Sequence, residues 1–359
     1  MSFTSKYTGE QIDALLDAVG QGGGGGDTPS SGWTGHADAE GLRAIGWTDE
    51  DIAYYQAHGV NWNAEDDEYH KVSDDNKALY GVLTADNIST YKDRIVYLPK
   101  IDTSGLTTMA QMFQNFYTLV AIPMLDTSGV TSMTNMFYGC CSLTCIPLLD
   151  TSNVTNMGYM FRSCSQLTYV PLLDTSKVNN MGSMFYGCSI LESIPLLDTG
   201  SATGMTSMFY SCSSLKEIPL LNTENVTSMN SMFRGCSALV SIPALDTQNV
   251  TNMTSFAHNC YSLVSIELLD AINMTTVTSM FTNCYALSYI KLQNVKASYG
   301  FENSPLLSKE SLLYLITNNN ASTVVTMTLS AVAYEKLSKD EDIIYALNKN
   351  GRIRIAKAS

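Results

Sequence analysis

The sequence predicts an α/β solenoid, an array of eight 24-residue units with a parallel sheet, a helical N-terminal cap and an α+β C-terminal cap. The first observation behind this prediction is that proline recurs every 24 residues along the middle of the chain. These prolines are Pro99, Pro123, Pro147, Pro171, Pro195, Pro219 and Pro243. The second observation is that leucine, isoleucine and phenylalanine recur in the same register across residues 99–290. A fixed period of this length is the signature of stacked repeats, in which each unit buries its apolar side chains against its neighbours.

Each unit reads approximately I-P-x-L-D-T-S-x-V-T-x-M-x-x-M-F-x-x-C-x-x-L-x-x. The stretch L-x-x-I-P-x-L is short and branched, which predicts a short β-strand with its pairing centred beside the proline. D-T-S-x-V is typical of a turn. In M-x-x-M-F-x-x-C the apolar residues stand at helical or 3₁₀ spacing, which predicts that they point inward.

The segments on either side of the array divide the chain further. We expect an amphipathic attachment helix over 1–19, a glycine-rich linker over 20–32, a helical N-terminal capping domain over 33–98, the solenoid over 99–298 and a C-terminal cap over 299–359. In the N-terminal cap, helices are predicted over 38–45 and 49–56, the second capped by Thr48 with Asp51 at the capping-box position. The C-terminal cap is predicted to contain helices over 309–318, 331–337 and 342–348 and strands over 324–329 and 352–356.

The predicted helix over 8–20 carries one apolar stripe, formed by Ile12, Leu15, Leu16 and Val19. A helix of about twelve residues is marginal alone, so the stripe needs a partner. Two interpretations stay open for this segment: a frayed terminal helix, or a site of homo-oligomerisation or of docking to a larger assembly such as a virion.

Composition excludes several classes of function. Apolar residues make up 45% of the chain and charged residues only 15%, which is typical of a folded protein rather than a disordered one. The net charge of −14 and the absence of a basic face argue against nucleic-acid binding and against attachment to an anionic membrane. No run of 18 apolar residues and no secretory signal is visible, so we expect neither membrane insertion nor conventional export.

Two polar columns run along the array and are interpreted as structural. The cysteines are Cys140, Cys164, Cys188, Cys212, Cys236, Cys260 and Cys284, and Phe116 takes the same position in the first unit, so the column is predicted to be buried core with free thiols. Disulfides and zinc are the alternatives, but a line of seven thiols neither pairs completely nor converges on one point.

The aspartates of the second column are Asp102, Asp126, Asp150, Asp174, Asp198, Asp246 and Asp270, with Asn222 in the sixth place. Because asparagine substitutes, accepting backbone N–H bonds from the following turn explains the column better than calcium does.

Two outward-facing sets are the candidate binding residues. The residue after each Phe should point outward, and this set contains Tyr138, Arg162, Tyr186, Tyr210, Arg234 and His258. Tyrosine and arginine are typical of interface hot spots, and aromatic faces stack on sugars; the alternative is that these side chains stack on one another. The strand face offers a second set through Tyr169, Glu192, Lys216, Glu217 and Tyr289, whose positions vary between units while the scaffold does not. Neither set nor any histidine forms a catalytic, nucleotide or metal motif, so we expect no enzyme and no cofactor.

The repeat D-T-S-x-V-T-x-M-x-x-M-F-x-x-C resembles the BspA-like leucine-rich repeats, and the resemblance covers the whole array. It implies adhesion or binding in proteins of gut bacteria and their phages. With the glycine-rich tether and the missing signal, it favours a phage virion protein, similar to a tail fibre or appendage, that recognises a cell-surface glycan or protein. The alternatives are a bacterial cell-surface adhesin and an intracellular protein-interaction scaffold.

Overall fold

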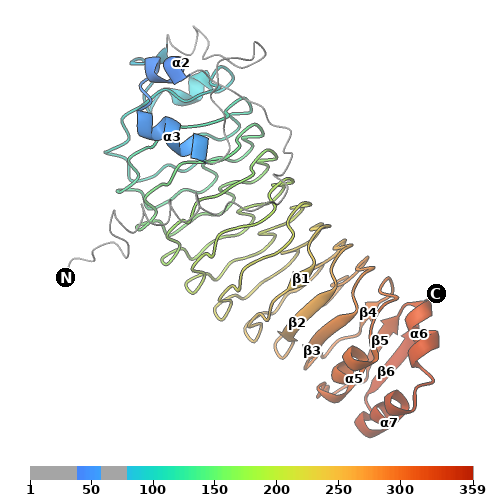
Figure 1. Ribbon diagram of the computed structural model, residues 1–359. Coiled ribbons are helices and arrows are strands. Elements are labelled where there is room, and N and C mark those ends of the chain that lie inside the picture. The colour runs from blue at the N-terminus through green and yellow to red at the C-terminus, as the bar shows by residue number, and fades with distance from the viewer. Residues whose placement is uncertain (1–38, 58–78, 359) are drawn as a thin grey trace. The chain divides into compact units, whose positions relative to one another are not determined.

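The computed structural model describes residues 39–57 and 79–358, all of which lie in one compact unit, Gly35–Ser359. The elements are α2 (Ala39–Ala44), α3 (Asp49–Ala57), the 3₁₀ helix η1 (Ile88–Tyr91), β1 (Ser241–Ile242), β2 (Ser265–Asp270), β3 (Tyr289–Gln293), β4 (Tyr299–Phe301), α5 (Lys309–Thr317), β5 (Val325–Leu329), α6 (Ala331–Leu337), α7 (Glu341–Asn350) and β6 (Ile353–Lys357) (Figure 1). No helix in these ranges is long and apolar enough to cross a membrane. The predicted helix over 8–20 and the linker over 20–32 lie outside the described residues.

The middle of the chain winds into stacked coils joined by parallel bridges. Each bridge links residues 24 positions apart, and the ladder runs through Thr108, Ser132, Asn156, Asn180, Gly204, Ser228, Asn252 and Thr276. The strands keep the same interval, since Ser241 pairs with Ser265 and Ser265 with Tyr289. The chain is therefore a solenoid with parallel pairing, as the sequence predicts.

The expected strand in every unit is not observed. In the described array, regular strands form only as β1, β2 and β3, and β1 ends directly before Pro243. In β2 and β3, Glu267 and Lys291 replace the proline, and both strands continue through that position, with a register shift between Ile266 and Leu269. Proline has no N–H to donate, so units that contain it cannot extend a ladder there.

The segment M-x-x-M-F-x-x-C forms consecutive turns instead of a helix. Its N–H groups alternate in direction: Phe161 donates to the Met184 carbonyl of the next coil at 2.9 Å, and Arg162 donates to Tyr159 in its own turn at 3.1 Å. Tyr159 and Ser163 have left-handed φ angles of 61° and 63°, which reverse the chain every fourth residue. The Met, Phe and Cys side chains are nevertheless buried, as predicted.

A stack of parallel phenylalanine rings forms the centre of the core. Neighbouring ring centroids are 5.4–5.7 Å apart along Phe113, Phe137, Phe161, Phe185, Phe209 and Phe233. The cysteine column lies beside it, and all nine cysteines are free thiols, which confirms the sequence interpretation. Each thiol of the column donates to a carbonyl 27 residues earlier, as Cys164 does to Phe137 at 3.1 Å. Burial raises the pKa of the Cys284 thiol to about 12.

The aspartate column closes the turns that follow the strand segments. Asp126 Oδ1 accepts hydrogen bonds from the Ser128 hydroxyl at 2.7 Å and the Ser128 N–H at 3.0 Å, and these bonds lower the pKa of Asp126. Asn222 Oδ1 accepts the same bond from Glu224 N–H at 3.1 Å. The prediction that the column needs an oxygen acceptor rather than a charge is therefore confirmed.

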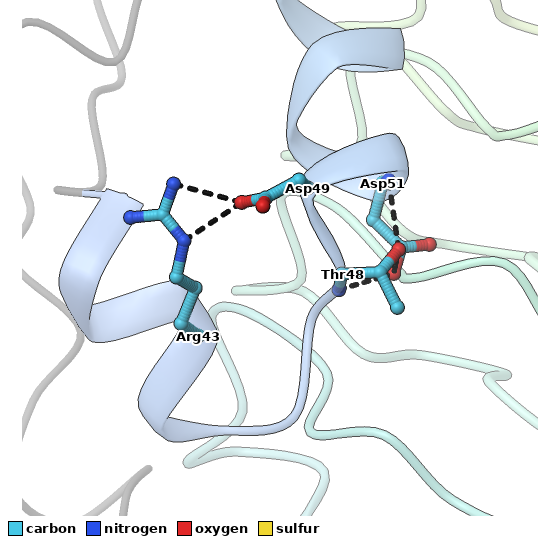
Figure 2. A network of polar contacts seen from close by, with 4 residues as sticks. All are labelled: Arg43, Thr48, Asp49 and Asp51. Carbon is cyan, nitrogen blue, oxygen red and sulfur yellow. Dashed lines mark hydrogen bonds and ion pairs between the residues drawn. The ribbon is translucent and has the colours of Figure 1, made fainter.

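Helix α3 begins at a capping box that also joins it to the array. Thr48 and Asp51 exchange hydrogen bonds, with Asp51 N–H donating to Thr48 Oγ1 at 3.1 Å and Thr48 N–H donating to Asp51 Oδ2 at 2.7 Å (Figure 2). The other oxygen of Asp51 accepts the Met124 N–H at 2.7 Å. Asp51 is 1% exposed, so this carboxylate fixes α3 against a coil of the solenoid.

After the array, β4, β5 and β6 form a second parallel sheet in that order. The predicted helices and strands of this region are present and begin or end within three residues of their expected bounds, and β4 is an addition that the sequence did not predict. Ser308, Ser330 and Asp340 cap α5, α6 and α7 with side-chain oxygens.

Candidate binding surfaces

The first surface is the set of six side chains one position after the buried phenylalanine column, in which Ala257 replaces the phenylalanine before His258; it is here called the arginine–tyrosine column. It comprises Tyr138, Arg162, Tyr186, Tyr210, Arg234 and His258. Each of these residues donates its N–H to the carbonyl three residues earlier, which turns the side chain outward, and all six are partly exposed. The structure therefore brings the predicted column together on one face of the coils.

Most members of the column stack on one another. The Arg162 guanidinium lies 4.1 Å from the ring centroid of Tyr186 and 5.7 Å from that of Tyr138. Tyr186 and Tyr210 stack with centroids 4.4 Å apart, and Arg234 lies 5.5 Å from the Tyr210 ring. A cation over an aromatic face stabilises the pair by about 0.5–2 kcal/mol. Because these contacts occupy ring faces, the column leaves little of the flat surface on which a sugar would stack.

His258 ends the column in a partly desolvated position. Burial lowers its pKa, and the neighbouring Arg234 lowers it further. Its Nδ1 and the Nε of Arg162 are buried atoms without a hydrogen-bond partner among the described residues. These features fit a tightly packed column better than a set of groups free to reach a ligand.

The second surface is the strand face, and helix α3 covers its beginning. The Tyr55 hydroxyl donates to the Ile122 carbonyl at 2.8 Å, and the Tyr54 hydroxyl donates to the Ile146 carbonyl at 3.1 Å. Burial raises the pKa of Tyr54, and Tyr169 contributes to the rise, which places Tyr169 beside the helix. Helix α3 therefore covers part of the coils that carry Ile122 and Ile146 and reaches as far as Tyr169 in the next coil.

The other predicted residues of the strand face occupy successive coils. Lys216 Nζ forms an ion pair with Glu192 at 2.7 Å, and Glu217 beside them is exposed. Tyr289 lies near the end of the array, where Lys291 approaches its ring at 5.4 Å. The structure thus pairs Glu192 with Lys216 and places Tyr169 and Tyr289 far apart along the same face, in coils 120 residues apart in sequence.

The strand face also carries a column of exposed leucines that the sequence pattern does not reveal. It consists of Leu148, Leu172, Leu196 and Leu220, with 49%, 53%, 63% and 65% of their surfaces exposed. Each follows the proline of its unit, and the next leucine is buried. Met124, which takes the same position one unit earlier, donates its N–H to Asp51 of α3. The leucine column therefore continues the face that α3 covers.

A solenoid of 24-residue coils with an exposed apolar column defines this chain as a repeat protein. The chain belongs to the family described as "Mycoplasma protein of unknown function, DUF285", whose model matches residues 86–193 and 203–304. A comparison with curated proteins finds no match.

Two solved structures are similar to the chain at low identity. One is a leucine-rich repeat protein of T. pallidum, 16% identical, covering 74% of this chain and 88% of the other with a TM-score of 0.24. The second is TLR13 in a complex with ssRNA13, 13% identical, covering 77% of this chain and 45% of the other with a TM-score of 0.24. Because both TM-scores are low, the solenoid assignment rests on the 24-residue bridge register of the chain itself.

Proposed function

We propose that the chain is a non-enzymatic binding module that adheres to a protein through its strand face. The observation that carries this proposal is the leucine column, because a contiguous row of exposed apolar side chains on a folded protein marks an interaction site. The Glu192–Lys216 pair and Glu217 would form a polar rim beside it.

Of the two ligand classes expected from the sequence, a protein fits better than a glycan. Sugars stack on open aromatic faces, and the rings of Tyr186 and Tyr210 face each other and the neighbouring arginines. A leucine row instead offers apolar area, which is what protein interfaces bury at their centre. Glycan recognition through Tyr169 or Tyr289 stays the alternative.

More specifically, we propose that this binding module is part of a phage virion and binds the surface of a bacterium. The resemblance of the repeat to BspA-like proteins and the glycine-rich segment before the solenoid support it. A bacterial cell-surface adhesin and an intracellular scaffold are the alternatives. Mass spectrometry of purified phage particles beside washed cell envelopes separates them: peptides enriched in particles are expected, and peptides enriched in envelopes or in soluble lysate would reject the virion assignment.

The binding proposal is tested by adding one charge to the leucine column. Leu220→Lys is expected to weaken adhesion of the labelled full chain to washed cells of the source culture at least tenfold, since burying a leucine contributes about 1.5–3 kcal/mol. Gln248→Lys is the matched control, because Gln248 is exposed in the turn of the next coil and the substitution adds the same charge.

Treating the cells before the assay identifies the ligand class. Protease treatment is expected to abolish adhesion and periodate treatment to leave it intact. Equal adhesion of Leu220→Lys and Gln248→Lys would contradict the strand face as the binding site. Sensitivity to periodate alone would contradict a protein ligand.

A further inference from the structure

The bridge ladder of the solenoid stops one step before the next strand. Thr276 is the last residue of the ladder, and Gly300 stands 24 residues later within β4. In the described part of the chain no bridge joins these two residues, and β4 pairs with β5 instead. A cavity of about 430 Å³ lies between them, lined by residues 277–280 and 282 of the last coil and by 298–300, 302, 303 and 328.

The last coil presents unused hydrogen-bond donors to this cavity. One coil earlier, the N–H groups of Met253, Ser255 and Ala257 donate to carbonyls of the following coil at 3.1, 2.9 and 2.9 Å. The equivalent donors are those of Val277 and Ser279, which line the cavity, and of Phe281 next to its lining residues, and none has an acceptor among residues 39–57 and 79–358.

The coil that ends the ladder is also looser than those before it. The Thr282 N–H lies 3.5 Å from the Ser279 carbonyl, whereas the corresponding bond from His258 to Ser255 is 3.2 Å. This lengthening fits a coil that lacks the neighbour which would hold it.

The opposite wall of the cavity carries a negative charge. Glu302 lines the cavity, and its carboxylate lies so close to Gly300 that any side chain at position 300 would overlap it. Glu302 forms no ion pair with a described residue. N–H donors alone would suit an anion, but a carboxylate in the same cavity repels one.

We propose that this cavity is a slot for an extended peptide segment of a partner protein, with a basic side chain that pairs with Glu302. Every second carbonyl of an extended strand points to the same side, so one edge of such a peptide supplies acceptors to a row of N–H groups at alternate residues. Glu302, which lines the cavity and forms no ion pair with a described residue, supplies the charge that a basic side chain of the peptide would neutralise. The slot differs from the strand face and serves a second contact.

The test uses the folded full chain and two panels of acetylated hexapeptides. Both panels vary valine, threonine and serine around one fixed position, which is lysine in the first and glutamate in the second. Fluorescence polarisation measures binding, and hydrogen exchange reports protection of the amides at 277–283 and 299–301. Lysine peptides are expected to bind at least tenfold more tightly than glutamate peptides and to slow exchange in both segments.

Three variants locate the site. Thr278→Trp places a large side chain in the slot and is expected to weaken binding at least tenfold, whereas Thr251→Trp, at an exposed position of the preceding coil, is expected to change nothing. Glu302→Gln keeps the shape and is expected to remove the preference for lysine. Circular dichroism confirms that each variant is folded.

Several outcomes would overturn the slot. They are absence of protection by either panel in the native chain, binding that survives Thr278→Trp, and a lysine preference that survives Glu302→Gln. Protection at 277–283 by an oligosaccharide and by no peptide would reassign the cavity to sugars. None of these results affects adhesion through Leu220, so the two proposals fail independently.

Discussion

At the scale of the residue, Asp51 decides where the N-terminal helix lies. Its carboxylate accepts hydrogen bonds from Thr48 and from Met124, which is 73 residues away. The capping box with Thr48 follows from the sequence, because the spacing of the two residues is enough to predict it. The hydrogen bond from Met124 cannot be predicted from the sequence in the same way, because it depends on which coil the helix packs against.

Asp51→Ala is expected to destabilise the attachment of α3 by about 2–4 kcal/mol, because it removes a helix cap and leaves the Met124 N–H without its acceptor. Asp49→Ala is the control, since Asp49 pairs with Arg43 on the surface and such pairs contribute at most about 1 kcal/mol. Hydrogen exchange of α3 and urea unfolding measure both variants. Equal effects of the two substitutions would show that Asp51 does not anchor the helix.

At the scale of the element, the alternating burial of successive residues in the strand segments explains why the sequence predicts the buried leucines but not the exposed ones. Leu196 and Leu197 are adjacent, yet Leu196 is 63% exposed and Leu197 is 2% exposed, because successive residues of an extended segment point to opposite faces. Two apolar residues in a row look like core, so the exposed column was missed. Nothing in one unit alone shows which of the two faces is covered.

The sequence of each unit also contains evidence for turns in place of the predicted helix. The helical spacing of the apolar residues correctly predicts which side chains are buried, but it wrongly predicts a helical backbone. Consecutive turns with alternating right- and left-handed residues bury the same side chains. Gly, Asn and Ser recur at the two left-handed positions of the unit, as at Ser207 and Ser211. Gly and Asn tolerate a positive φ, so their recurrence at these positions, as at Asn135 and Gly139, indicates turns rather than a helix.

Ser207 provides a test of this backbone, because its φ angle is 56°. Ser207→Val is expected to destabilise the fold by about 1–2 kcal/mol, since a β-branched residue is strained in the left-handed region. Ser207→Gly is expected to be neutral or slightly stabilising. Thermal and urea unfolding compare the two variants, and a valine variant as stable as the glycine variant would contradict the left-handed turn.

At the scale of the whole molecule, each coil contacts only its neighbours, so the solenoid holds together through a chain of local interfaces. The 24-residue period predicts the stacking of the coils, because periodicity is a property of the sequence alone, but not the backbone within each coil. It did not predict the break at Thr276, where the sequence continues but the pairing changes partner. That change depends on the sheet of β4, β5 and β6, which forms through contacts outside the repeat.

Phe185→Ala is expected to cost about 3–5 kcal/mol, because it opens a cavity in the middle of the ring stack. Tyr186→Ala, at the next residue, removes a partly exposed ring and is expected to cost about 1 kcal/mol. Hydrogen exchange should show faster opening of the coils around 161–209 in the phenylalanine variant and little change in β5. Uniform loss of protection through β5 would instead show that the array unfolds as one unit.

The shared bridge register has a consequence for how such a chain changes over evolutionary time. Every coil offers the same backbone groups to the coil before it and the coil after it, so a whole unit gained or lost in frame leaves all remaining junctions matched. Each such event moves the two ends apart or together by about 4.8 Å. Recombination between near-identical repeats therefore changes the length of the array in fixed steps, while the segments at its two ends and their surfaces stay unchanged.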